Sequence, residues 1–235
     1  MTTQTLPTTI DQVIDRMQRI DDQLAPRDGV ACFNRMYLKV TRLVKQHVGA
    51  GTFQDDAFLE RLDVIFANLY LSQVDAAADG RRVDPSWQPL FDLRDNDVIW
   101  PIQFAFAGMN AHINHDLPLA VVQTCTERGT TPGTPPVHQD YEKVNDLLAE
   151  VEAEVRAEFE TRLFHVATQP AEALKHAVGT FSIDTARETA WTIAENLWHE
   201  RGLPLIYKGH VETLALLVGT ASRALLVPVV PPPAA

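Results

Sequence analysis

The stretch VIWPIQFAFAGMNAHINHDLPLAVVQTCT, residues 98–126, decides the fold, because its apolar side chains point in almost every direction around a helix. A helix turns by about 100° per residue, and one that is apolar nearly all round has to be enclosed by other elements. Pro118 lacks a backbone donor, so we expect it to kink or end the helix. The stretch therefore predicts a buried central helix.

Helical periodicity continues on both sides of this segment. Apolar residues recur at three- and four-residue steps, whereas no segment alternates with period two, so strands should be few or absent. The other expected helices cover residues 10–24, 30–48, 55–74, 138–163, 183–201 and 210–226. The predicted fold class is all-α, a single-domain bundle of roughly seven helices over residues 1–227. A Pro-rich C-terminal tail, 228–235, follows it.

Composition narrows the classes of partner. The chain has 235 residues and a formal net charge of −11, with Lys and Arg scattered, so neither nucleic acid nor an anionic membrane is an expected partner. Two cysteines, Cys32 and Cys125, are too few for a disulfide framework. We see neither a secretory signal nor an apolar run of about 18 residues, so a cytoplasmic protein is the expectation. The expected partner is a small-molecule substrate or ligand.

Five polar residues interrupt the central segment: Asn110, His112, Asn114, His115 and Asp116. An enclosed polar group without a partner costs about 1–3 kcal/mol, so these residues require a network, a ligand or a metal. The two asparagines could simply bond the backbone of neighbouring helices. His112 and Asp116 are four residues apart, which lets an imidazole and a carboxylate converge on one ion, and His115 could join them. The same spacing also describes a carboxylate that orients a catalytic or structural histidine.

Two other segments offer metal ligands. His138 and Asp140 stand at the expected start of a helix, directly after the loop 127–137. Glu195 and His199 are four residues apart on a later helix. The alternatives are that Asp140 stabilises the helix N-terminus while His138 is solvated, and that Glu195 and His199 belong to an exposed salt-bridged face.

Polar tips on largely apolar helices indicate candidate substrate-binding residues. Aromatic walls with a few hydrogen-bonding groups suit a small organic ligand, although core packing explains the same residues equally well. The candidates are Asn34, Tyr37, Asn68, Tyr70 and Tyr141. The sequence contains no G-x-S-x-G, P-loop, dinucleotide fingerprint, C-x-x-C or H-E-x-x-H motif.

Several longer segments resemble a bacterial family that is a domain of unknown function, and the likeness spans almost the whole chain. They are DGVACFNRMYLKVT (28–41), FLERLDVIFANLYL (58–71), WQPLF (87–91), PIQFAFAGMNAHINHDLPLAVV (101–122) and HQDYEKVN (138–145). The resemblance implies no chemistry. Its GMNAHIN-x-DLP block favours Asn110, His112, Asn114 and Asp116 as the positions of interest.

A local likeness adds a hint about chemistry. His112, Asp116 and Pro118 are similar to the H-x-x-x-D pattern by which the all-α zinc-dependent phospholipase C and single-strand nuclease group presents ligands to clustered zinc. The sequence departs from that pattern at Val122, where a further histidine would be expected.

The leading hypothesis is a metal-assisted enzyme, such as a hydrolase, with a divalent metal (Zn, Mn or Fe) bound on the central helix. Its ligands would be His112 and Asp116, completed by Glu195 and His199 or by His138 and Asp140.

Two alternatives remain open. One is a metal-free helical enzyme of the cyclase or isomerase type, acting on a small hydrophobic metabolite. It would use a His112–Asp116 dyad, with Asn110 and Asn114 orienting a carbonyl. The other is a non-catalytic ligand-binding module whose polar network stiffens the core. The apolar helix 210–226 could seal a homodimer or complete the bundle.

Overall fold

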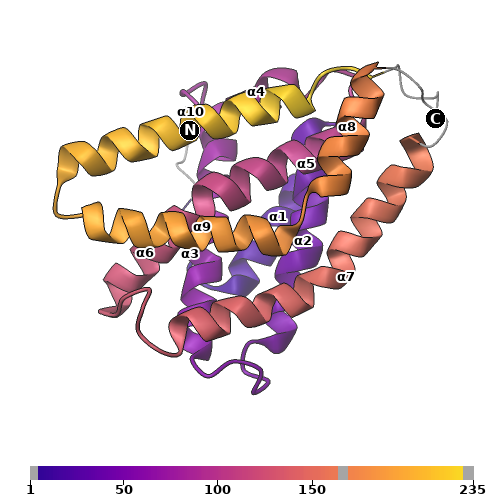
Figure 1. Cartoon of the computed structure of the whole chain (residues 1–235). Helices are drawn as coiled ribbons and strands as arrows, with labels where there is room; N and C mark the ends of the chain where they lie inside the picture. The colour runs from indigo at the N-terminus through magenta and orange to yellow at the C-terminus, as the bar shows by residue number, and fades with distance from the viewer. Residues whose placement is uncertain (1–4, 164–168, 230–235) are drawn as a thin grey trace.

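The computed structural model describes residues 5–163 and 169–229, and within these ranges the chain forms helices and no strand (Figure 1). The elements are α1 (Ile10–Gln23), α2 (Gly29–His47), α3 (Asp56–Ala78), α4 (Gln88–Leu93), α5 (Pro101–Ala111), the π-helical turn η1 (His112–Asp116), α6 (Leu117–Arg128), α7 (Val137–Leu163), α8 (Gln169–Thr180), α9 (Ile183–Glu200) and α10 (Pro204–Leu225). The predicted all-α, single-domain fold is confirmed.

Side-chain caps and prolines fix where the helices begin. Thr9, Asp28, Asp55 and Ser182 each accept a hydrogen bond from a backbone N–H in the first turn of the helix that follows. Proline stands in the first turn of α5, α6 and α10, where its missing donor costs nothing. The residues at and next to each of these helix N-termini therefore determine where the helix begins.

The segment α5–η1–α6 is the buried centre of the molecule. Helices α2 and α10 pack against α5, while α3 and α9 pack against α6. The predicted helix 98–126 is not continuous, however, because the backbone N–H of Leu117 bonds the carbonyl of His112, five residues back. The irregularity expected at Pro118 therefore lies before it, and Pro118 itself stands in the first turn of α6.

Two helices meet closely beside this centre. A Cβ on Gly108 would lie 2.3 Å from the ring of Phe33, and one on Gly29 would lie 2.5 Å from the ring of Phe104. Both positions therefore require glycine for α2 and α5 to approach each other. The close approach brings the Phe33 ring within 5.7 Å of the His112 ring, measured between centroids.

Two helices, α4 and α8, were not predicted from the sequence, and some predicted helix ends differ from those in the structure. Segment 84–97, predicted as a connector, contains α4, whose Leu90 and Phe91 are buried as is the preceding Trp87. Helix α8 was not predicted, and α10 begins at Pro204 rather than at residue 210. Of the predicted tail, residues 230–235 lie outside the described part of the chain.

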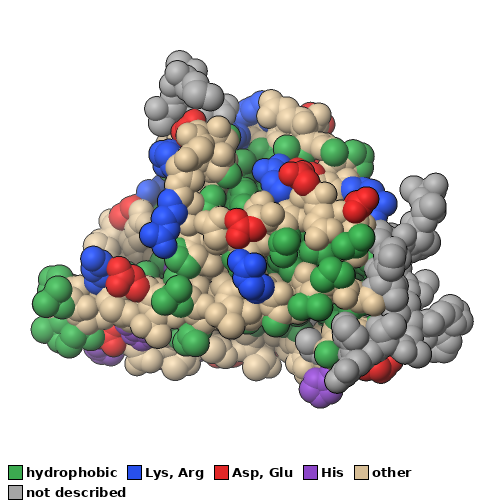
Figure 2. Space-filling model, turned by 90° about the horizontal axis from the view of Figure 1, so that it is seen from above, with side chains coloured by type: hydrophobic (Ala, Val, Ile, Leu, Met, Phe, Trp, Pro, Cys, Tyr) green, Lys and Arg blue, Asp and Glu red, His purple; other side chains and the backbone are tan. Residues whose placement is uncertain are grey.

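Helix α10 forms an antiparallel hairpin with α9 and covers α5 (Figure 1). Its buried face includes Ala215 and Val218, so it completes the bundle. Its outer face leaves Leu205 86%, Leu216 61% and Leu217 65% exposed. Figure 2 shows hydrophobic side chains among charged ones on this side of the molecule. The homodimer stays a prediction. None of the described helices has the length and apolarity needed to cross a membrane.

Candidate functional site

Three buried N–H donors surround the carboxylate of Asp116 at the π-helical turn. His112 and His115 belong to the turn itself, whereas Trp87 directly precedes α4. Asp116 Oδ2 accepts hydrogen bonds from His112 Nδ1 at 3.0 Å and from Trp87 Nε1 at 2.9 Å. Its other oxygen, Oδ1, accepts from His115 Nδ1 at 2.9 Å. Because a carboxylate only accepts, both histidines carry a proton on Nδ1. Single π-helical turns are frequent at functional sites, since they re-aim side chains within a helix.

The pKa shifts assign charges to this group. Burial alone would raise the pKa of Asp116, but the hydrogen bonds from His112 and His115 outweigh it and lower the pKa. Burial lowers the pKa of His112 despite the neighbouring carboxylate. For His115 burial is opposed by the hydrogen bond and charge of Asp116 and by the charge of Asp84, which together raise the pKa. Asp116 is therefore ionised and His112 is neutral.

Aromatic rings hold the imidazole of His112 in place. The Phe66 ring stacks on it with centroids 3.5 Å apart and planes 6° apart, and the Tyr37 ring meets it edge-on at 4.4 Å. His112 is 3% exposed. Its Nε2 is buried and has no hydrogen-bond partner among the residues described. In the neutral ring with a proton on Nδ1, this Nε2 atom is a vacant acceptor.

His112 lines an apolar pocket of about 80 Å³ between α2, α3, η1, α7 and α9. Its apolar walls include Phe33, Met36, Leu62, Phe66, Met109 and Val144. One water needs about 10–15 Å³ on this kind of scale, and a cavity of about 150 Å³ accepts benzene. The pocket therefore has room for a small organic group of a few heavy atoms.

Asp63 on α3 also lines this pocket, although it is not among the site residues predicted from the sequence. Its Oδ2, like Tyr37 Oη, is buried without a partner in the described part of the chain. Burial raises the pKa of Asp63 to about 7. A signal existed, since Asp63 follows Leu59 by four residues and precedes Phe66 by three, on the apolar stripe of its helix.

The two asparagines of the central helix have a structural role, because their side chains form hydrogen bonds within the protein. Asn110 Nδ2 donates to the carbonyl of Val218 at 3.0 Å and to Ser222 Oγ at 2.9 Å, which ties the centre to α10. Asn114 Nδ2 donates to Asn110 Oδ1 at 3.0 Å. Neither asparagine lines the pocket, so the hypothesis that they orient a substrate carbonyl there is not supported by their placement.

Of the five predicted substrate-binding residues, the structure places Tyr37 at the pocket. Asn34 Nδ2 donates to a backbone carbonyl of α1 at 2.8 Å, and Tyr70 Oη donates to Asn34 Oδ1 at 3.3 Å. Asn68 Nδ2 donates to the carbonyl of Pro7 at 2.9 Å. These polar tips satisfy other groups of the protein, which matches the core-packing alternative.

Asp140 and Tyr141 also bond within the protein. Asp140 accepts from the backbone N–H groups of Gln54 at 2.8 Å and Asp55 at 2.7 Å, and it pairs with Lys143. These donors lower its pKa, although burial acts in the opposite direction. Tyr141 Oη donates to the carbonyl of Arg187 at 2.7 Å. Both side chains therefore fasten α7 to its neighbours.

The predicted metal sets do not converge. Glu195 and His199 are exposed on α9. Across residues 5–163 and 169–229, the three metal-ligating side chains found with atoms within 4.8 Å of one another are His138, Glu142 and Glu188. His138 was predicted as a ligand, whereas its two carboxylate neighbours were not.

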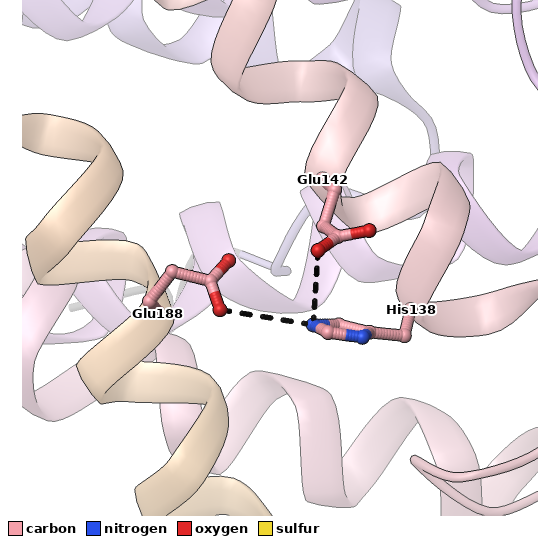
Figure 3. A group of neighbouring side chains, drawn as sticks. All are labelled: His138, Glu142 and Glu188. Carbon is pink, nitrogen blue, oxygen red and sulfur yellow. Dashed lines mark ion pairs between the residues drawn. The ribbon is translucent and has the colours of Figure 1, made fainter.

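Figure 3 shows these three side chains, which we call the α7–α9 cluster, facing one another across the two helices. His138 Nε2 lies 3.9 Å from Glu142 Oε1 and 4.0 Å from Glu188 Oε2. These separations exceed a hydrogen bond, yet they suit two ligands that each bind one ion at about 2.0–2.2 Å. The ring stacks on Trp191 with centroids 4.4 Å apart. The cluster could hold a divalent cation at the surface.

Comparison with known proteins identifies the family of this chain but no activity. The model of a family of unknown function, DUF5995, matches residues 10–228. Searches for similar curated proteins and solved structures return no match.

Proposed function

This chain belongs to the DUF5995 family of unknown function, and we propose that it binds a small, mainly apolar molecule in the pocket and transfers a proton on it. His112 would be the general base. The observation that carries the proposal is the buried Nε2 of His112, which has no partner among the described residues although the ring lines the pocket. An unpaired acceptor in an apolar site costs free energy that a ligand can recover.

The surroundings of His112 suit a base. The Asp116 carboxylate holds the proton on Nδ1, so Nε2 can accept a proton and the resulting imidazolium would lie beside a negative charge. Burial keeps the pKa of His112 low, so the ring is neutral and ready to accept at neutral pH. The step we propose breaks a C–H bond of the ligand and forms N–H at Nε2; returning the proton to another carbon completes an isomerisation without a co-reactant.

The first test asks whether the pocket binds small molecules. Suitable probes are n-butanol, cyclopentanone, n-butylamine and butyrate, each of about five or six heavy atoms. The methionine methyl groups report the site by NMR, because Met36 and Met109 line the pocket whereas Met17 is buried elsewhere. We expect at least one probe to shift the signals of Met36 and Met109 and to leave that of Met17 in place. If no probe does so, the proposed function is wrong.

The second test addresses the base. Deuterium uptake at the carbons beside the carbonyl of cyclopentanone, measured by NMR in D2O, reports proton abstraction. We expect wild type to speed this uptake above the rate with His112→Gln, while His115→Gln, which also borders Asp116 but does not line the pocket, keeps the effect. Equal rates with wild type and His112→Gln would remove the catalytic part of the proposal and leave a binding module.

A metal-dependent enzyme, such as a hydrolase, is the second candidate, and the α7–α9 cluster is the observation that favours it. A cation bound there would act as a Lewis acid or would activate water. Elemental analysis of untagged wild type beside Glu188→Gln and His112→Gln tests it. Near-stoichiometric Zn, Mn or Fe that is lost only in Glu188→Gln would support this candidate. Metal that is lost only in His112→Gln would place the metal site on the central helix instead. A metal-free wild type would count against a metal site at either position.

A further inference from the structure

We infer that the ligand of this pocket is a small amine, bound as a cation with its ammonium group against Asp63 and its apolar part among the aromatic rings. The inference rests on the proposed binding function and names the chemical class of the ligand. Asp63 is a carboxylate of the pocket that the proposed proton transfer does not use.

Asp63 differs from the other buried carboxylates described. Asp116 accepts from His112, His115 and Trp87, and Asp140 accepts from two backbone N–H groups and pairs with Lys143. Asp28 caps α2 and forms an ion pair with an arginine. For Asp63, which is 9% exposed, the described residues supply no ion pair, and its Oδ2 has no donor. A buried carboxylate without a partner is costly to ionise, so ionised Asp63 would be stabilised by a ligand that supplies a positive charge.

The charged and titratable side chains around the pocket do not fill that role. They are Tyr37 on α2, His112 on η1 and Arg187 on α9, whereas α7 contributes Val144 and Leu148. Burial raises the pKa of Tyr37 and lowers that of His112, so both are neutral. The guanidinium of Arg187 donates to the carbonyl of Tyr141 at 2.7 Å and lies 4.0 Å from the centroid of its ring.

The remaining walls suit an organic cation. Rings of Tyr37 and Phe66 border the pocket, and an ammonium group within about 6 Å of an aromatic face is attracted by its electrons. An anionic ligand would instead add a second negative charge beside Asp63. Without ligand the carboxyl takes up a proton readily, because burial raises its pKa to about 7, and binding of an ammonium group would release that proton.

The experiment compares n-butylamine with its neutral analogue n-butanol and its anionic analogue butyrate, at constant ionic strength. Dissociation constants come from the Met36 and Met109 methyl signals, with Met17 as the internal reference. At pH 8 we expect n-butylamine to bind wild type at least about tenfold more tightly than either analogue. Asp63→Asn should lose this preference, whereas Glu60→Gln, which removes an exposed carboxylate from the same helix, should keep it.

The pH dependence gives a second readout that needs no variant. Affinity of wild type for n-butylamine should change little from pH 8 to 9 and should fall about tenfold per pH unit between pH 6 and 5, as Asp63 becomes protonated. Tighter binding of n-butanol or butyrate, or a preference for the amine that persists in Asp63→Asn, would overturn the inference while the pocket itself stands. If none of the three probes binds, the inference is wrong, and if cyclopentanone does not bind either, the proposed binding function is wrong as well.

Discussion

Replacing Asp63 by asparagine should stabilise the ligand-free protein, and the gain should grow with pH. Burial raises the pKa of this carboxyl from 3.8 to about 7. Between those values the unfolded chain has lost the proton that the folded protein still holds, so the stability of wild type falls as pH rises through this window. Above about pH 7 both states are ionised, and the folded state then carries an unpaired buried charge.

The magnitude follows from the same difference. It amounts to about three pH units, and each unit corresponds to about 1.4 kcal/mol, so wild type should lose up to about 4 kcal/mol of unfolding free energy between pH 4 and 8 through this group. Asp63→Asn has no such proton equilibrium. Any constant cost of its buried amide is the same at every pH and cancels when the differences between variant and wild type are compared.

Urea unfolding at pH 4.5, 6, 7 and 8 measures the effect for wild type, Asp63→Asn and Glu60→Gln. The free-energy difference between Asp63→Asn and wild type should increase steadily up to about pH 7 and then level off. Glu60→Gln should stay close to wild type, because its carboxylate is exposed. A difference between Asp63→Asn and wild type that is constant across the series would show that Asp63 has a partner or is solvated, and would refute the reasoning.

Three further predictions concern the polar network, the helix packing and the oligomeric state. Asp116→Asn leaves one of the three donors at this carboxylate without an acceptor, so it should lower the free energy of unfolding in urea by about 2–4 kcal/mol. A decrease below about 1 kcal/mol would mean that the network contributes little to stability. Gly108→Ala places a Cβ 2.3 Å from the Phe33 ring and should lower the free energy of unfolding by about 1–3 kcal/mol. The control Gly209→Ala has nothing within 4 Å of its Cβ and should not lower it, so equal melting temperatures for the two variants would contradict this prediction. Leu217→Glu should dissociate a dimer sealed by α10, and sedimentation velocity that finds the same mass before and after the change would exclude that interface.

Most of the fold could be predicted because long amphipathic helices repeat their pattern many times. The central segment 98–126 was found because its apolar residues leave no face for solvent. Helix α4 has only 6 residues, too few for a periodic signal, and its boundaries depend on the tertiary burial of Trp87 and Phe91. The π-helical turn was not predicted, because one additional residue within a continuous helical pattern leaves the local propensities unchanged.

The site was harder to predict than the fold. Partners four residues apart, such as His112 and Asp116, can be proposed from spacing alone, and the structure brings them together. The sequence did not reveal that Asp63 faces the same pocket, because that depends on how α3 packs against α2 and η1. Glu188 joins His138 for a similar reason, since α7 and α9 meet only in the folded chain.

The π-helical turn has a consequence for how this chain can change over time. The hydrogen bond of this turn spans five residues where an α-helix spans four, so the turn holds one extra residue within nearly the same rotation and rise. Deleting one residue from 112–116 would therefore restore regular α-helical geometry and leave the faces of α6 that meet α3 and α9 aligned with those of α5 that meet α2 and α10. The fold should tolerate that deletion, whereas the convergence of His112, His115 and Trp87 on Asp116 would be lost, so the extra residue serves the site and not the bundle.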